Sequence, residues 1–177
     1  EQLGGCLLLK TNVAVPKGSG LGTSSILAVA CIRALHELYG EFLAEEELCQ
    51  QALVVEQLMS TGGGWQDQVG GVFPYVKLIR TSVGIQQQFT IQRIDLSREI
   101  LAELNERFVL VYSGQRRLAR NILREVIGKV LLRDPVSMGI LDEIQKLAVL
   151  MAFELERGNI TEFAHLLSKH WNLSVAL

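Results

Sequence analysis

The chain has 177 residues, a hydrophobic fraction of 49%, a charged fraction of 20% and a formal net charge of −2 at pH 7. This composition is typical of a globular protein with a substantial core, organised as one domain or two small ones. The charge gives no electrostatic reason to expect binding to nucleic acid or to an anionic membrane. The three cysteines, Cys6, Cys31 and Cys49, are odd in number and lack metal-ligand spacing, which favours a reducing cytoplasmic compartment.

The first predicted unit is a strand, a glycine-rich loop and a helix. An apolar extended run, Cys6 to Val15, precedes three glycines in five positions, and an apolar helix is expected over Ile26–Leu38, ending at Gly40. Glycine lets a ligand approach the backbone, and the start of a helix offers unpaired N–H groups and the positive end of its dipole. The pattern therefore predicts a site for nucleotide phosphates on the loop residues Pro16, Lys17, Gly18, Ser19, Gly20, Leu21, Gly22, Thr23, Ser24 and Ser25.

The loop differs from the two most familiar phosphate loops. A Walker A loop ends in Gly-Lys-Ser/Thr, whereas this loop ends Gly22-Thr23-Ser24, and a dinucleotide fingerprint needs a glycine where Thr23 stands. A plain strand-to-helix turn is therefore the alternative interpretation of the loop taken alone.

A second helix, Ala44 to Met59, carries a carboxylate beside its predicted buried stripe. The stripe consists of Leu48, Ala52, Val55 and Met59. Glu56 lies beside it, where a carboxylate is costly unless it has a partner. From the residues themselves, we expect a glutamate at the boundary of the stripe that is paired to an arginine.

A second motif, Thr61 to Gly71, reads T-G-G-G-W-Q-D-Q-V-G-G. Within it, the residues by themselves favour Asp67 as a turn aspartate that caps local N–H groups. Trp65 either stacks on the apolar face of a sugar or fills the core. A strand is expected over Val69–Ile79.

The rest of the chain is predicted to become mainly helical. Strands are expected over Gln86–Ile94 and Arg107–Tyr112, and a short helix capped by Asp95 over Leu96–Asn105. A helix opening at Gln115 carries arginines that suit either a phosphate or a solvated basic face. After a break at Asp134-Pro135, two amphipathic helices are expected over Ile140–Leu155 and Ile160–Leu173, separated by a left-handed stop at Gly158 or Asn159.

Three stretches carry a resemblance to a known family. The loop P-x-G-x-G-L-G-[ST]-S-S resembles the ATP loop of the GHMP kinases, and Thr61–Gly71 resembles the segment that holds their catalytic aspartate. Val111 to Arg120 is similar to a segment of the fucokinase branch. The resemblance implies an α+β fold, with an N-terminal GHMP α/β layer followed by the mainly helical beginning of the C-terminal GHMP domain. We expect these domains over residues 1–100 and 101–177, with the boundary within 95–106.

The same resemblance implies a site and a reaction. The family's ATP would bind the loop from Pro16 to Ser25, Ser24 and Glu56 would bind Mg²⁺, and Asp67 would act on the hydroxyl of a small sugar. The acceptor would be L-fucose, giving fucose 1-phosphate. The residues that the resemblance assigns to the sugar are Gly63, Gly64, Trp65, Gln66, Arg117 and Arg120.

Two alternatives stay open beside the fucokinase interpretation. One is a heptose-7-phosphate kinase of the same branch, for which the helix carrying Arg117 and Arg120 would supply extra basic contacts. The other is a truncated, non-catalytic fragment that binds a nucleotide or a partner chain. The first residue is Glu1 rather than methionine, and no stop signal follows Leu173, so we expect a truncated kinase.

Overall fold

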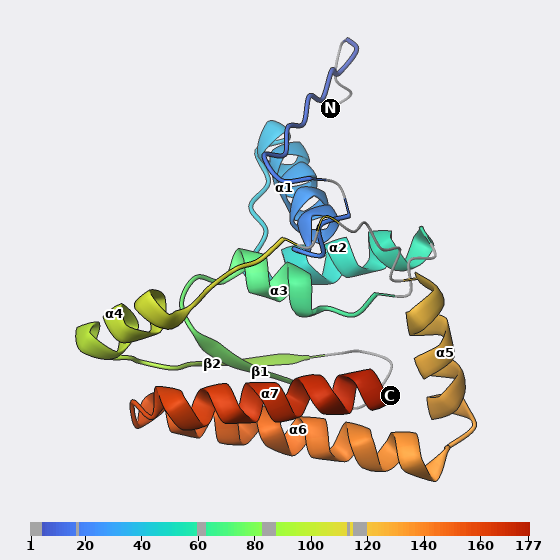
Figure 1. Ribbon diagram of the computed structural model, residues 1–177. Coiled ribbons are helices and arrows are strands. Elements are labelled where there is room, and N and C mark those ends of the chain that lie inside the picture. Colours follow the sequence, from blue (N-terminus) through green and yellow to red (C-terminus); the bar gives the residue numbers. More distant parts are fainter. Residues whose placement is uncertain (1–4, 17, 60–62, 83–87, 113, 115–119) are drawn as a thin grey trace. The chain divides into compact units, whose positions relative to one another are not determined.

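The computed structural model describes residues 5–16, 18–59, 63–82, 88–112, 114 and 120–177 (Figure 1). The chain divides into two compact units, Glu1–Val72 with Tyr112–Leu118, and Phe73–Val111 with Ala119–Leu177. This division falls after Val72, because the two strands after Val72 pair with each other and the first of them packs against a C-terminal helix. The expected domains over residues 1–100 and 101–177 stay a prediction.

The described part of the first unit contains three helices. They are α1 (Thr23–Leu38), α2 (Glu45–Leu58) and α3 (Gln66–Val72), and each packs against the other two. The apolar spacing predicted the first two to within a few residues. The third was not predicted, because its seven residues are too few to show a helical period.

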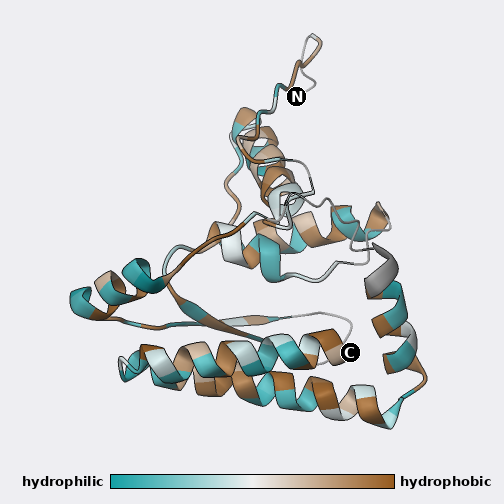
Figure 2. Ribbon diagram, viewed as in Figure 1, coloured by the Kyte–Doolittle hydropathy of each residue, from teal (hydrophilic) through white to brown (hydrophobic). Residues whose placement is uncertain are grey.

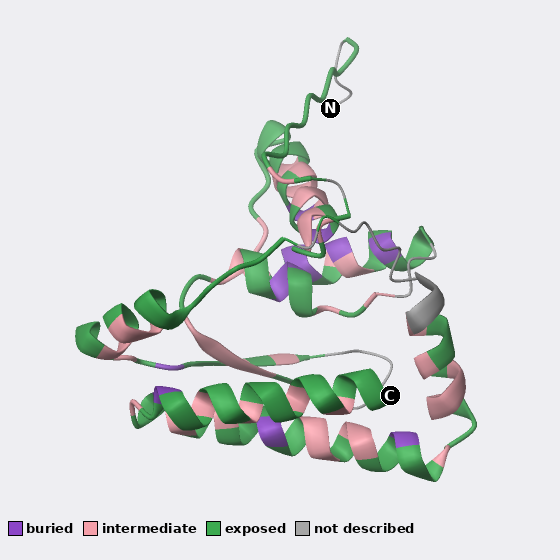
Figure 3. Ribbon diagram, in the orientation of Figure 1, coloured by how far each residue is buried: buried purple, intermediate pink, exposed green. Residues whose placement is uncertain are grey.

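The core of this unit lies between the three helices. Its buried residues are Val29, Leu48 and Ala52, and the partly buried residues packed against them are Ala28, Ile32, Leu43 and Val72 (Figure 3). Helices α1 and α3 approach so closely that a Cβ added at Gly71 would lie 2.6 Å from Cγ1 of Ile26. A side chain at this position would therefore push the two helices apart.

Cys49 of α2 is fully buried. Burial raises the pKa of the Cys49 thiol to about 11, and the negative charges of Glu46 and Glu45 act in the same direction. The thiol is therefore protonated near neutral pH and unreactive, because the thiolate is the nucleophile.

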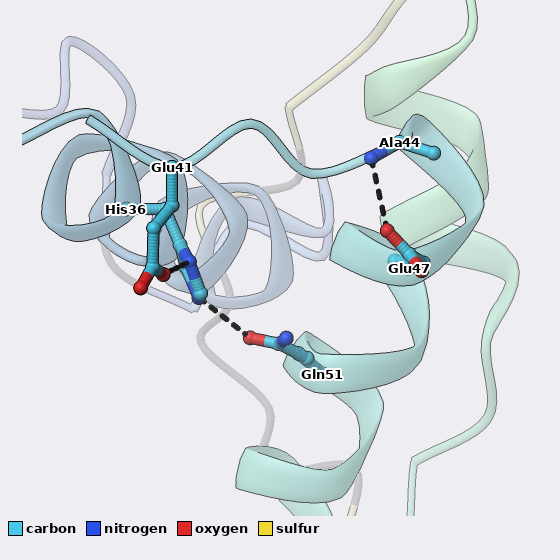
Figure 4. Close-up of polar contacts among 5 residues, drawn as sticks. All are labelled: His36, Glu41, Ala44, Glu47 and Gln51. Atoms are coloured by element: carbon cyan, nitrogen blue, oxygen red, sulfur yellow. Dashed lines mark hydrogen bonds and ion pairs between the residues drawn. The ribbon is translucent and has the colours of Figure 1, made fainter. Parts of the chain in front are cut away.

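Polar contacts connect the end of α1 to α2 (Figure 4). The imidazole of His36 lies with Nδ1 2.6 Å from Glu41 Oε2 and Nε2 3.2 Å from Gln51 Oε1. At the start of α2 the Ala44 N–H donates to Glu47 Oε2 at 3.2 Å. The sequence indicated a surface histidine without a role, whereas the structure gives His36 a place in the α1–α2 connection.

The second unit combines a two-stranded sheet with four helices in its described part. Strands β1 (Lys77–Thr81) and β2 (Phe89–Arg93) are antiparallel, with Lys77 opposite Arg93 and Thr81 opposite Phe89. The helices are α4 (Arg98–Arg107), α5 (Arg120–Leu131), α6 (Pro135–Glu156) and α7 (Ile160–Ala176), of which α6 and α7 lie side by side (Figure 1). The mixture of helices and strands agrees with the predicted α+β class. Among the described helices, none has the length and apolar character that crossing a bilayer requires.

The core of the second unit joins β1 to the C-terminal helices. Its buried residues are Ile94, Ala152 and Leu155, and the partly buried apolar residues packed against them are Val76, Leu78, Leu96, Leu104 and Phe163. This core explains why the strands group with the helical part of the chain.

The glycine stops lie where the sequence placed them, whereas α6 begins five residues before the predicted start at Ile140. Gly40 and Gly158 adopt left-handed conformations, with φ of 71° and 73°, after α1 and α6. Helix α6 begins at Pro135, and the Asp134 carboxylate caps it by accepting bonds of 2.8 Å and 2.7 Å from the N–H and hydroxyl of Ser137. These two bonds hold the pKa of Asp134 below its ordinary value, and the bond from the Ser137 hydroxyl has the larger effect.

The cap of α4 differs from the prediction. Ser97 caps this helix by accepting a bond of 3.3 Å from the Ile100 N–H. Asp95, the predicted cap, instead forms an ion pair of 2.6 Å with Arg93.

Three predicted strands are wrong. Residues 5–15 and 108–112 lie in no strand among the described residues. Both segments contain hydrophobic stretches (Figure 2), and their leucines, valines and aromatic residues are largely exposed. A strand must pair its backbone N–H and C=O groups, and within the described residues no second strand pairs with either segment. Val69–Ile79 instead divides into the end of α3 and the start of β1, because a short apolar run does not distinguish a helix from a strand.

Candidate active site

The glycine-rich loop has the backbone conformation that its composition indicated. Gly18, Gly20 and Gly22 have φ of 78°, 79° and 64°, in the left-handed region that favours glycine. The Ser19 N–H donates to the Pro16 carbonyl at 3.1 Å and closes a turn within the loop. The loop therefore leads into α1 through a tight, glycine-dependent path.

The start of α1 suits an anion. Its N-cap is Gly22, whose lack of a side chain leaves the first N–H groups of the helix without a side-chain acceptor from this position. The Ser19 hydroxyl is also buried, with no hydrogen-bond partner among the described residues. An orphaned hydroxyl beside a helix N-terminus fits a ligand rich in acceptor oxygens, such as a phosphate chain.

The other loop residues differ in accessibility. Ser25 is buried, Thr23 is half-buried, and Pro16, Leu21 and Ser24 are exposed. Lys17 lies outside the described residues.

Asp67 lies directly against the end of this loop. A Cβ added at Gly22 would be 2.7 Å from Asp67 Cγ and 3.0 Å from its Oδ1. The Asp67 side chain is exposed and lies in the first turn of α3. At the start of this helix the Val69 N–H donates to the Trp65 carbonyl at 3.2 Å. The fold thus brings the aspartate of the second motif to the glycine loop of the first.

Glu56 is buried at the junction of the three helices, with 7% of its surface exposed. Its Oε1 accepts a bond of 2.6 Å from the Ser25 hydroxyl, and its Oε2 accepts a bond of 2.7 Å from Gln68 Nε2. The carboxylate therefore accepts hydrogen bonds from two neutral donors, one on α1 and one on α3.

The oxygen donors near this loop suit a Mg²⁺ ion that is bound together with nucleotide phosphates. The described residues contain no group of three or more His, Cys, Asp or Glu side chains that could hold a metal by themselves. Mg²⁺ is commonly held by one or two protein oxygens together with substrate phosphates and water, which matches the donors near this loop. Of the two predicted ligands, Glu56 is engaged with Ser25 and Gln68, and the Ser24 side chain is exposed.

The residues predicted to contact the sugar lie before α3 and at its first position. The Gly63 carbonyl accepts a bond of 2.6 Å from Gln57 Nε2, which ties this segment to the end of α2. Trp65 is half-buried, and Gly64 and Gln66 are exposed. Arg117 and the side chain of Arg120 lie outside what the structure describes.

Sequence reasoning did not assign a role to Gln68. It lies beside Asp67 in the second motif, is fully buried, and connects α3 to Glu56. A signal was present, because Gln68 and Val72 share a face at i, i+4 once the segment is interpreted as a helix. The expectation of a strand from Val69 concealed this relation.

Comparison with known proteins connects this geometry to a family. Residues 1–74 match the family described as "GHMP kinases N terminal domain". The chain is 38% identical over 164 residues to the L-fucokinase/L-fucose-1-P guanylyltransferase of Bacteroides fragilis, covering 93% of this chain and 17% of that protein. It is 36% identical over 167 residues to the bifunctional fucokinase/GDP-fucose pyrophosphorylase of Arabidopsis thaliana, covering 94% and 16%.

A third relative is a D-glycero-alpha-D-manno-heptose 7-phosphate kinase of Campylobacter jejuni, 30% identical over 164 residues, covering 92% of this chain and 47% of that protein. The chain thus spans about a sixth of the first two relatives and about half of the third. No solved structure gave a significant match. From these matches, residues 1–74 are similar to the GHMP kinase N-terminal domain family, and nearly the whole chain is similar to part of the two fucokinases.

Proposed function

We propose that this chain carries the phosphoryl-transfer site of a sugar kinase that uses ATP to convert L-fucose into fucose 1-phosphate. The observation that supports this most directly is the contact between Gly22 and Asp67. This contact supports the proposal because a carboxylate, which can accept a proton, lies close to the end of the loop that we propose for phosphate.

The loop would bind the phosphates of ATP. The proposed donors are the N–H groups from Gly18 to Ser24, except that of Ser19, which donates to the Pro16 carbonyl, together with the buried hydroxyl of Ser19. The N-terminus of α1 adds the positive end of its dipole. These donors stand in place before the reaction, so they stabilise charge on the transferring group without reorganisation.

Asp67 would act on the acceptor sugar. Its exposed carboxylate accepts or orients the proton of the attacking hydroxyl, whose oxygen forms the new bond to the γ-phosphorus while the bond to the β-phosphate oxygen breaks. ADP leaves, and the proton of the hydroxyl is released. The remaining contribution is positioning, because phosphoryl transfer leaves a protein little covalent work.

Mg²⁺ would be held between the phosphates, Ser24 and Glu56. When bound, it neutralises negative charge on the phosphate oxygens. Glu56 is oriented by the Ser25 hydroxyl and the Gln68 amide, so its carboxylate cannot turn freely.

L-fucose is the favoured acceptor because the two fucokinase relatives are 38% and 36% identical to this chain. A heptose 7-phosphate is the second candidate, since the relative named for that activity is 30% identical over most of the chain. For either acceptor, Gly63, Gly64, Trp65 and Gln66 would line the sugar, and Arg117 and Arg120 would supply basic contacts.

The test is ATP-dependent phosphoryl transfer to a panel of sugars that includes L-fucose and a heptose 7-phosphate. Asp67→Asn should reduce turnover by at least about a hundredfold and leave ATP affinity within a few fold, because it removes the proton acceptor and leaves the loop intact. Asp142→Asn, on α6 of the second unit, is the matched control and should retain full turnover.

The outcomes separate the candidates. Transfer to L-fucose supports the favoured acceptor, and transfer to the heptose 7-phosphate alone would replace it with the second candidate. Nucleotide binding without transfer to any sugar would favour a non-catalytic binding role. Near-normal turnover by Asp67→Asn would remove that residue from the chemistry.

A further inference from the structure

The Glu56 carboxylate joins all three helices of the first unit. It projects from α2, accepts from the Ser25 hydroxyl of α1 at 2.6 Å, and accepts from the Gln68 amide of α3 at 2.7 Å. Because a buried carboxylate is stable only with such donors, the positions of the helices and the orientation of this group depend on one another.

Gln68 serves this carboxylate in a specific orientation. Its side chain is fully buried, with Nε2 toward Glu56, while its Oε1 is buried without a partner among the described residues. The opposite amide orientation would place Oε1 against the carboxylate, so the donor must face Glu56. An apolar side chain would fill the same space without leaving an unsatisfied acceptor. Gln68 therefore contributes through the hydrogen bond that its Nε2 donates to Glu56, rather than through packing.

The same bond sets the rotation of α3. This helix has seven residues, two turns, and a helix of that length depends on tertiary contacts for its stability and orientation. Successive residues are about 100° apart around a helix. With Gln68 facing Glu56, the neighbouring Asp67 faces the end of the loop, against Gly22.

We propose that Gln68 is a positioning residue of the phosphoryl-transfer site: its amide N–H, bonded to Glu56, holds that carboxylate and sets the rotation of α3 that places Asp67 against Gly22. The proposal rests on the proposed function and adds to it a residue that touches neither phosphate nor sugar. It acts through two residues of the site, so its loss should affect the chemical step more than the binding of ATP.

The test substitutes Gln68→Met, which keeps the length and apolar stem of the side chain and removes the amide. With L-fucose and ATP, kcat should fall by about tenfold or more while KM for ATP changes by less than about threefold, and the Mg²⁺ concentration for half-maximal rate should rise. Gln51→Met is the matched control. It removes a different α1–α2 contact, the one to His36, and should leave kcat and the Mg²⁺ requirement unchanged.

Two further measurements guard against a simple folding defect. Gln68→Asn keeps the amide on a side chain that is one methylene shorter. It should show the same selective fall in kcat, but a smaller one than Gln68→Met. Thermal unfolding of Gln68→Met, Glu56→Met and the double variant should be non-additive, since either single substitution already removes the Gln68–Glu56 bond.

The results distinguish this proposal from the function on which it rests. A wild-type protein that transfers phosphate to no sugar overturns the proposed function and this proposal together. An active wild type with unchanged kcat in Gln68→Met, with an equal loss in Gln51→Met, or with a change in KM for ATP alone, overturns the role of Gln68 and leaves the function standing.

Discussion

Gly22→Ala tests the contact that supports the candidate active site. Gly22 has a φ of 64°, where a residue with a Cβ costs about 1–2 kcal/mol. The new methyl would also lie 2.7 Å from Asp67 Cγ and 2.9 Å from its Cβ, closer than real contacts allow. Overpacking of this kind costs about 1–3 kcal/mol when the surroundings cannot relax. Together the two effects predict a loss of about 2–5 kcal/mol in the free energy of unfolding.

Gly20→Ala is a matched control within the same loop. Its φ of 79° imposes the same kind of backbone strain, but a Cβ there meets nothing within 4 Å. We therefore expect Gly20→Ala to lose only about 1–2 kcal/mol. The difference between the two variants isolates the contact with Asp67.

Urea unfolding of the two variants and the wild type measures this difference. If Asp67 stays in place, Gly22→Ala should be less stable than Gly20→Ala by about 1–3 kcal/mol. If Asp67 moves aside, the stabilities converge and the loss appears in turnover, where 1.4 kcal/mol corresponds to about a tenfold change. Equal stability and equal turnover of the two variants would refute the placement of Asp67 against the loop.

Three further predictions concern the fold. Gly71→Ala should destabilise the protein by about 1–3 kcal/mol, because its Cβ would lie too close to the Ile26 side chain of α1. Gly70→Ala, whose Cβ meets nothing within 4 Å, should stabilise it by about 0.5–1 kcal/mol. Urea unfolding of both variants compares the two effects directly. With a pKa of about 11 and no exposed surface, Cys49 should react with a thiol reagent at pH 7.5 far more slowly than exposed Cys6, and rapid labelling of Cys49 in the folded protein would contradict its burial. Asp134→Ala should lower Tm at pH 7, because the charged cap is bonded only in the folded state. Since the folded pKa of Asp134 is below the ordinary value of about 3.9, that difference in Tm should persist above this pH and shrink as pH falls through the folded pKa; a difference that is constant down to pH 2 would contradict the capping role.

The sequence by itself determined those features that local chemistry controls. The long helices α1, α2, α6 and α7 follow from apolar periodicity, and the stops at Gly40 and Gly158 follow from the left-handed conformation that glycine allows. The glycine loop could be predicted as a phosphate site because its residues are contiguous, and that assignment stays a prediction. Each of these features depends on residues within a turn or two of one another.

The tertiary structure alone decided which distant groups meet. Whether residues 5–15 and 108–112 form strands depends on a pairing partner, which their own sequence cannot specify. The donors to Glu56 and the approach of Asp67 to Gly22 depend on how α3 packs against α1 and α2. A buried carboxylate can accept hydrogen bonds from an arginine, a hydroxyl or an amide. The packing of the three helices therefore decides which of these donors it meets.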